Sequence, residues 1–156
     1  MSFIASAPVS DAPADDTIAN DGFWPDLSLV AAREAMRLDG TVTGPRLRHA
    51  LIAAVIETAR DVRDWKAARQ GEGYATLADV PGDKVDGNSV ASQCYLRAVY
   101  CYAKADLVER MSDFDLAATG QKRAEWLDTT PDEQRRNAAW AITALLGRPR
   151  TTVELI

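Results

Sequence analysis

The chain has 156 residues, of which 47% are hydrophobic and 26% are charged, and its formal net charge is −5. These values are typical of one globular domain with a modest core and room for a tail at either end. The negative net charge argues against a protein whose main task is to grip nucleic acid, because it repels phosphates.

The sequence also argues against membrane insertion and secretion. It has no run of the roughly 20 uncharged apolar residues that a membrane-spanning helix needs. Its N-terminus lacks the basic start and long apolar run of a secretory signal. We therefore expect a soluble protein that is made in a cytosol.

Residues 1–22 predict a flexible acidic arm. They are rich in Ala, Ser, Pro and Asp and contain no Lys or Arg. Such a segment buries too little apolar surface to offset the entropy of ordering. We expect it to be disordered when free and to take shape against a neighbour such as another subunit.

Two helices are predicted in the first half of the chain. The first runs from about Ser28 to Asp39, where Gly40 supplies a left-handed stop. The second begins near Pro45, a residue tolerated in the first turn, and continues to about Gln70. Its apolar residues follow a single stripe of three-and-four spacing. They are Leu47, Leu51, Ala54, Val55, Thr58, Val62 and Trp65.

The middle of the chain predicts a loop and the central helix of a bundle. Residues 74–88 are rich in Gly, Pro and Asp, which indicates a loop. A third helix, capped by Asn88 or Ser89, should run to about Met111. Its apolar side chains cover nearly all sides, as in a helix at the centre of a bundle. Residues 114–128 look helical, with an interruption at one glycine.

The last helix has the clearest start signal in the chain. Thr130 can cap it, Pro131 suits the first helical position, and Glu133 can close a capping box. Gly147 ends the helix. The remaining segment, residues 148–156, alternates apolar and polar side chains like a short strand.

These elements predict an all-α fold, a small helical bundle of about four to five helices. The bundle would occupy residues 23–147. It would carry an extended N-terminal arm, residues 1–22, and an extended C-terminal tail, residues 148–156.

No catalytic or metal-binding arrangement is recognisable in the sequence. Cys94 and Cys101 lie about 10 Å apart on one predicted helix, at a rise of about 1.5 Å per residue. A disulfide needs Cα atoms within about 7 Å, so we interpret both as core residues. His49 points to solvent, away from the core stripe, and these three residues cannot form a Cys–His zinc site. We expect no enzyme activity, no metal and no cofactor.

Basic residues on the outward side of the second helix allow two interpretations. The arc consists of Arg46, His49, Arg60 and Arg63, bordered by Arg48 and Lys66. Such an arc could contact phosphates. Acidic residues sit among these positions, and they are Glu57, Asp61 and Asp64. A mixed, solvated face is therefore the favoured interpretation.

Three apolar side chains lie off the predicted core faces. Ile52 and Ile56 point roughly 140–180° away from Leu47 at 100° per residue. Trp140 lies away from the apolar face of the last helix. A subunit interface and a wide ordinary core explain these positions equally well. Ile52, Ile56 and Trp140 are the candidate interface residues.

Short segments in a fixed order carry a resemblance to a known family. They are Phe23–Asp26 (FWPD), residues 35–43 (AMRLDGTVT), 73–81 (GYATLADVP), 97–110 (RAVYCYAKADLVER) and 145–156 (LLGRPRTTVELI). In this order and spacing they resemble the head completion proteins of tailed bacteriophages, the GPL family. The resemblance covers nearly everything from Phe23 onward.

The resemblance implies a non-enzymatic, all-α adaptor at the head–tail neck of a virion, assembled in the host cytoplasm. Such an adaptor docks beneath the portal protein after DNA packaging, stabilises the filled head and forms the interface to the tail. It implies a ring of twelve copies that meets a tail-terminator or neck protein. DNA would pass through the channel without sequence-specific binding, and no membrane is involved. A ring needs a head-to-tail interface, which offers a role to Ile52, Ile56 and Trp140.

The resemblance also assigns portal binding to the C-terminal tail, an extended segment suited to adding onto a partner's backbone. The candidate portal-binding residues are Arg148, Pro149, Arg150, Thr151, Thr152, Val153, Glu154, Leu155 and Ile156. The alternative function is that of a small helical DNA-binding packaging or regulatory protein. It draws on the basic arc and on the short helix, turn and long helix over residues 28–70.

Overall fold

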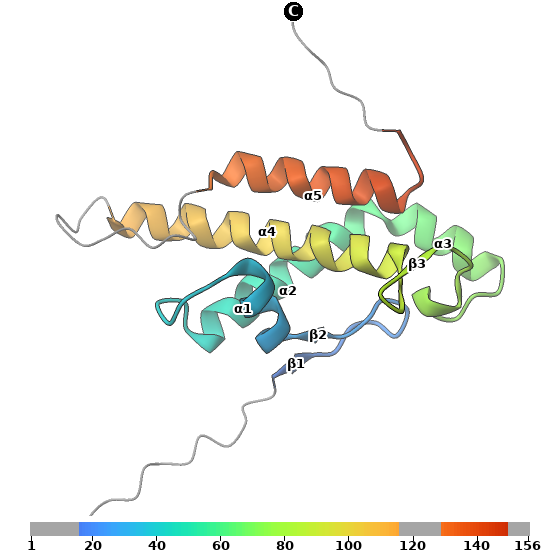
Figure 1. Ribbon diagram of the computed structural model, residues 1–156, viewed down its shortest axis with the longest axis horizontal. Helices are drawn as coiled ribbons and strands as arrows, with labels where there is room; N and C mark the ends of the chain where they lie inside the picture. The colour runs from blue at the N-terminus through green and yellow to red at the C-terminus, as the bar shows by residue number, and fades with distance from the viewer. Residues whose placement is uncertain (1–15, 116–128, 150–156) are drawn as a thin grey trace, which may run out of the picture.

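The computed structural model describes residues 16–115 and 129–149, and within them the fold is mostly helical (Figure 1). The helices are α1 (Leu29–Met36), α2 (Gly44–Asp61), α3 (Arg63–Gly71), α4 (Val90–Asp115) and α5 (Pro131–Leu145). The strands are β1 (Thr17–Ile18), β2 (Leu27–Ser28), β3 (Lys84–Val85) and β4 (Asn88–Ser89). The predicted helical bundle is confirmed, but the two small sheets make the fold not strictly all-α.

α4 is the central element of the bundle. α5 lies along it on one side, and α1 and α2 pack against it elsewhere (Figure 1). Its buried side chains extend from Tyr95, near its first turn, to Val108. Because neighbours surround it, apolar residues are needed around most of its circumference. The interpretation of the third predicted helix as the bundle centre is confirmed.

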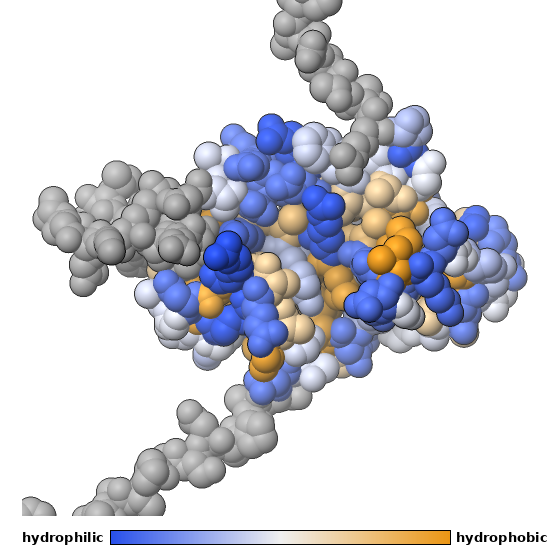
Figure 2. Space-filling model, viewed as in Figure 1, coloured by the Kyte–Doolittle hydropathy of each residue, from blue (hydrophilic) through white to orange (hydrophobic). Residues whose placement is uncertain are grey.

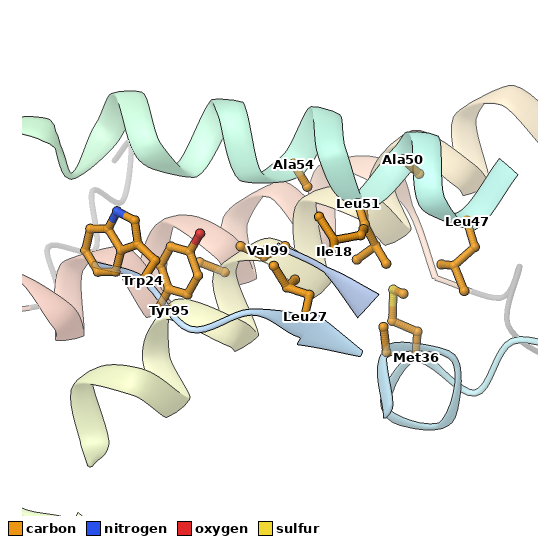
Figure 3. Close-up of a cluster of buried hydrophobic side chains, with 14 of the residues drawn as sticks. Ile18, Trp24, Leu27, Met36, Leu47, Ala50, Leu51, Ala54, Tyr95 and Val99 are labelled. Carbon is orange, nitrogen blue, oxygen red and sulfur yellow. The ribbon is translucent and has the colours of Figure 1, made fainter. Parts of the chain in front are cut away.

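The apolar stripe of α2 supplies much of the core. Figure 3 shows Leu47 and Leu51 of α2 facing the side of the core that holds Ile18, Leu27 and Val99. Each of these side chains is at most 6% exposed. Burying one such side chain contributes about 1.5–3 kcal/mol. The stripe therefore fastens α2 to both α4 and the N-terminal strands.

The folded body starts before the predicted end of the arm. β1 pairs antiparallel with β2, and Ile18 is buried. The Asn20 side chain donates a 2.8 Å hydrogen bond to the Tyr95 hydroxyl. These contacts offset the entropy of ordering, so the boundary that we predicted at residue 22 is wrong. Residues 16–22 belong to the body, and residues 1–15 lie outside the described residues.

An aromatic cluster holds this N-terminal segment on the helices. The Trp24 ring stacks on Tyr95 with a centroid distance of 4.5 Å and on Trp65 at 6.1 Å. The Phe23 ring meets Trp24 edge-on at 4.9 Å. Such aromatic pairs add about 0.5–1.5 kcal/mol each beyond their buried area.

The single helix predicted from Pro45 to Gln70 is in fact two helices. Val62 joins α2 to α3 with φ −108° and ψ 11°, and its side chain is fully buried. The turn at Val62 accompanies the packing of Trp65 on Trp24. That contact joins segments far apart in the chain, so local periodicity cannot foresee it.

The first helix ends at Met36, earlier than the predicted stop at Gly40. Arg37 takes the left-handed conformation, with φ 56°, and its N–H donates to the Glu34 carbonyl at 3.0 Å. The next residue, Leu38, is 7% exposed and joins the core. Burial of Leu38 outweighs the local preference for glycine at the stop.

The predicted loop over residues 74–88 contains regular structure. A 3₁₀ helix spans Leu77–Asp79, and β3 and β4 form an antiparallel hairpin. The two residues between these strands, Asp86 and Gly87, have φ 52° and 75°. Positive φ at both positions is the geometry that an Asp-Gly hairpin turn requires. The prediction missed this sequence signal.

The helix ends in the second half agree well with the prediction. The Ser89 hydroxyl accepts a 3.1 Å hydrogen bond from Ser92 N–H, so Ser89 rather than Asn88 caps α4. α4 continues past the predicted Met111 to Asp115, and residues 116–128 of the predicted next helix lie outside the described residues.

α5 begins and ends at the predicted residues, but the predicted capping box is not among the hydrogen bonds at its start. The Thr130 hydroxyl accepts a 3.2 Å hydrogen bond from Glu133 N–H. The Glu133 carboxylate itself accepts from the Thr129 hydroxyl at 3.2 Å. Gly147 follows the helix with φ 66°, the left-handed stop that glycine provides.

Candidate interaction surfaces

The outward side of α2 presents two isoleucines between two arginines. We call this row the α2 ridge, and its members are Arg48, Ile52, Ile56 and Arg60. Residues four apart on a helix lie on one face, about 6 Å apart along the axis. Ile52 is 40% exposed and Ile56 is 65% exposed. The predicted position of both isoleucines outside the core is confirmed.

The acidic residues of α2 face α4 instead of this ridge. The Tyr102 hydroxyl of α4 donates a 2.9 Å hydrogen bond to the Asp61 carboxylate. Burial, and then the bond to Asp61, raise the pKa of Tyr102, and the charge of Glu57 adds to the effect. Glu57 and Asp61 are therefore directed toward α4. The side of α2 next to α4 remains mixed in charge, because Arg60 also lies near Tyr102, whereas Ile52 and Ile56 are exposed on the outward side.

A cleft of about 500 Å³ lies between the start of α2 and the end of α4. Its described lining residues are Pro45, Arg46, His49, Asp106, Leu107, Arg110 and Met111. Arg110 pairs with Asp106 at 2.8 Å, and Arg46 Nη1 lies 3.9 Å from the Met111 sulfur. His49 is exposed, as predicted.

Trp140 lies on α5, apart from the α2 ridge. α5 and α2 pack on α4 from different sides (Figure 1). The Trp140 ring is partly buried, and the Arg136 guanidinium lies 5.3 Å from its centroid. The structure therefore gives the candidate interface residues two separate locations. An interface between unlike patches is what a head-to-tail ring uses.

A third exposed apolar site was not predicted. Val85 is 58% exposed in the β3–β4 hairpin, and Val90 at the start of α4 is 38% exposed. Figure 2 shows a hydrophobic area over this hairpin, surrounded by hydrophilic residues. The Asp-Gly turn signal would have placed Val85 on a hairpin.

The C-terminal segment leaves the body at an exposed position. Gly147, Arg148 and Pro149 follow α5 and are all exposed, and Arg148 N–H donates to the Thr143 carbonyl at 3.0 Å. These residues are the start of the candidate portal-binding tail. The rest of it, residues 150–156, lies outside the described residues.

The cysteines form no disulfide, and burial raises the pKa of both thiols. Cys94 and Cys101 are only partly buried, on α4. Among the described residues no group of three or more His, Cys, Asp or Glu side chains is placed to hold a metal ion. Over that same part of the chain, no helix combines the length and apolar character needed to cross a membrane.

A helical body with apolar side chains exposed at separate places offers candidate surfaces for contact with other proteins. The comparisons with known proteins name the family. The model of the family "Phage head completion protein (GPL)" matches residues 18–156, so the chain belongs to the phage head completion protein family.

Two relatives from phages align over nearly the whole chain. The head completion/stabilization protein of Escherichia phage P2 is 38% identical over 149 residues, which cover 96% of this chain and 86% of the relative. The probable head completion/stabilization protein of Haemophilus phage HP1 (strain HP1c1) is 23% identical over 145 residues, 91% of this chain and 94% of the relative. No solved structure matches. The resemblance stated from the sequence is confirmed.

Proposed function

We propose that this chain is a non-enzymatic adaptor that completes and stabilises the DNA-filled head of a phage virion. It docks beneath the portal protein after DNA packaging, forms a ring of twelve copies around the DNA channel, and meets a tail-terminator or neck protein at the head–tail neck. The observation that supports this proposal is the family match over residues 18–156, with relatives whose names give head completion and stabilisation.

The two separate apolar locations support the ring. A head-to-tail ring joins one patch on each copy to a different patch on the next. The α2 ridge, with Ile52 and Ile56, and the region of Trp140 on α5 supply two such patches on different helices. We assign the subunit interface to these three residues.

The C-terminal tail is assigned to the portal. It leaves the body after Gly147 at an exposed position, and its sequence alternates apolar and polar residues. An extended segment of this kind can add a strand to a partner and place alternate side chains in pockets. Its length from Arg148 to Ile156 allows a reach of about 30 Å at about 3.3 Å per residue.

Two truncations test this assignment. One removes residues 148–156, and the matched variant removes residues 150–156 and so keeps the bond from Arg148 N–H to the Thr143 carbonyl. Both should retain the thermal unfolding midpoint to within a few degrees, because the tail follows the last helix. Both should lose capture by purified portal rings of the same phage. Undiminished capture of either folded truncation would refute the tail assignment.

A further inference from the structure

The β3–β4 hairpin has two different faces. Val85 lies opposite Asn88 in the antiparallel register. Two pairs further from the turn, Val90 N–H donates to the Asp83 carbonyl at 2.9 Å. Side chains alternate between the two faces of a strand. The register therefore places Val85, Val90 and Asp83 on one face of the hairpin. Lys84 lies on the other face.

The face that carries the valines is apolar and acidic. We call it the hairpin face, and its members are Asp83, Val85 and Val90, with Asp86 beside them at the turn. Val85 is 58% exposed, Val90 is 38% exposed, and both aspartates are exposed. As diagonal neighbours across a hairpin, the two valines lie about 7–8 Å apart. The hairpin face thus presents two adjacent apolar side chains with carboxylates next to them.

The α2 ridge offers the complementary set of side chains. Ile52 and Ile56 are 40% and 65% exposed. They lie about 6 Å apart along the helix axis. Arg60, one turn beyond Ile56, is also exposed. The acidic residues of this part of α2, Glu57 and Asp61, are directed toward α4 instead. The ridge therefore presents two adjacent apolar side chains with a guanidinium beside them.

The hairpin face and the α2 ridge match in spacing and are opposite in charge. A ridge packed on a second ridge would bring arginines together, which disfavours that pairing. The Trp140 region also places a cation beside its apolar group, because the Arg136 guanidinium lies 5.3 Å from the ring centroid. The hairpin face has carboxylates directly beside its valines. It is therefore the better counterpart of the ridge.

The two surfaces lie on different sides of the body. α2 lies behind α4 in the view of Figure 1, and the exposed isoleucines are on the side of α2 that faces away from the core. The hydrophobic area over the hairpin is turned toward the viewer in Figure 2. One copy can therefore use both surfaces at once, each with a different neighbour. A contact between unlike surfaces of this kind is head-to-tail.

We propose that the hairpin face of one copy docks on the α2 ridge of the next copy. Val85 and Val90 lie on Ile52 and Ile56, and the two aspartates of the hairpin face lie beside Arg60. The occupant of the ridge is a second copy of this chain, recognised by its apolar and acidic hairpin. This inference rests on the proposed function, because it names the contact that repeats around the ring.

The contact is small when it stands alone. A standard interface buries roughly 800 Å² on each partner, which is more than a short hairpin provides. The C-terminal end of α5 lies at the same end of α4 as the hairpin (Figure 1), so the contact can continue onto the helix that carries Trp140. On a portal each copy is held by two neighbours as well, which raises the effective concentration of every contact. We therefore expect weak association between free copies and stable rings on the portal.

Two complementary variants isolate this contact for isoleucine methyl NMR. Val85→Asp keeps the ridge but places a charge among the valines, and this chain carries labelled isoleucines. Ile56→Asp keeps the hairpin face but disables the ridge, and this chain is unlabelled. Because the contact is weak, the unlabelled chain is added to about 1 mM. We expect the Ile52 and Ile56 signals of the labelled chain to move and to approach saturation.

The controls show whether the hairpin is the surface that binds. The Ile142 signal, from a core residue of α5, should stay in place throughout and so reports an intact fold. An unlabelled chain with both Val85→Asp and Ile56→Asp should leave the Ile52 and Ile56 signals where they are. Unmoved signals with the Ile56→Asp chain would overturn the proposal. Equal movement with the double variant would also overturn it, because another surface would then be the occupant.

A second titration tests the charges of the hairpin face. Asp83→Asn and Asp86→Asn are added together to the unlabelled Ile56→Asp chain, since asparagine tolerates the φ of 52° at position 86. We expect binding to weaken roughly threefold, because exposed charge pairs contribute little individually. Lys84→Gln in the same chain is the matched control, and it should not weaken binding because its charge lies on the other face. Equal weakening by both changes would contradict the assigned face.

Assembly on purified portal rings separates this inference from the proposed function. The parent chain should form rings on the portal, and Val85→Asp should lose them. If Val85→Asp forms rings as well as the parent, the hairpin contact is refuted while the proposed function stands. If the methyl signals move as expected but the parent forms no ring on the portal, the contact is supported and the proposed function is contradicted.

Discussion

Asp21 joins the connection between β1 and β2 to α3 through one carboxylate. It forms an ion pair with Lys66 of α3 and accepts hydrogen bonds from the N–H groups of Phe23 and Trp24, at 3.0 and 3.3 Å. Partial burial alone would raise its pKa. The bonds from Lys66 and the two N–H groups outweigh that effect and lower the pKa below its usual 3.8.

Asp21→Asn should therefore remove a pH-dependent part of the stability. A lowered pKa in the folded state stabilises the protein above the unfolded pKa, and this contribution is lost as the pH falls through the folded value. The Asp21 side chain is 43% exposed, so we expect a loss of at most about 1 kcal/mol at pH 6 and almost none at pH 2.5. Urea unfolding at both pH values measures the difference. Asp83→Asn, in an exposed loop, is the control, and an equal loss at both pH values would contradict the assignment.

Two substitutions on α2 separate a core residue from an interface residue. Leu51 is fully buried, and Leu51→Ala should reduce the free energy of unfolding by about 2–5 kcal/mol. Ile56 is 65% exposed, and Ile56→Ala should change it by less than about 0.5 kcal/mol. Ile56→Asp should then leave the fold intact but prevent ring assembly on the portal. A stability loss above about 2 kcal/mol for Ile56→Ala would show that Ile56 is covered in the free chain.

At the scale of single elements, the sequence predicts those ends of helices that are marked by a capping residue or a proline. It does not predict those ends that are set by tertiary packing. The start of α5 follows from Thr130 and Pro131, because a hydroxyl and a proline satisfy local needs of the first turn. The end of α1 depends on burial of Leu38, and the break at Val62 accompanies the stacking of Trp65 on Trp24. Both depend on tertiary packing, which the periodicity of residues along one helix does not describe.

The cap of α5 provides the prediction at this scale. Thr130→Ala removes the hydroxyl that accepts from Glu133 N–H at 3.2 Å. We expect a loss of about 1 kcal/mol, which lowers the thermal midpoint by about 2–4 °C for a domain of this size. Thr130→Ser keeps the acceptor and should retain most of the stability. Calorimetry of the three proteins checks this, and a midpoint for Thr130→Ala equal to that of the parent would show that the cap contributes nothing.

At the scale of the whole molecule, the sequence indicated which residues lie outside the core but not how they are grouped. Helical spacing was sufficient to predict that Ile52 and Ile56 point away from Leu47, and both side chains are exposed. The direction of Glu57 and Asp61, away from the ridge, follows from their position next to Tyr102 of α4. A projection of α2 alone cannot predict this, because it contains no residue of α4. The exposed Val85 belongs to the β3–β4 hairpin, which lies within the predicted loop over residues 74–88. The family itself could be recognised because several segments keep their order along the chain.

The distribution of charge over the whole molecule argues against the alternative function of DNA binding. The net charge is −5, and several cations are already engaged within the molecule. Lys66 pairs with Asp21, and Arg135 pairs with Glu109. Arg48 donates to the Thr17 carbonyl. The cations that remain on the outward side of α2 are too few to neutralise a long run of phosphates.

A gel shift across salt concentrations measures this directly. Non-specific DNA-binding proteins have dissociation constants of about 1–100 μM at physiological salt, and they lose affinity steeply as salt rises. For this chain we expect binding weaker than about 100 μM at that salt and a shallow dependence on salt, because few counterions are released. The variant Arg60→Gln/Arg63→Gln should behave like the parent. Tight binding that falls steeply with salt and is weakened in this variant would instead favour a DNA-binding packaging or regulatory protein, since it would require the basic side of α2 to carry the contact.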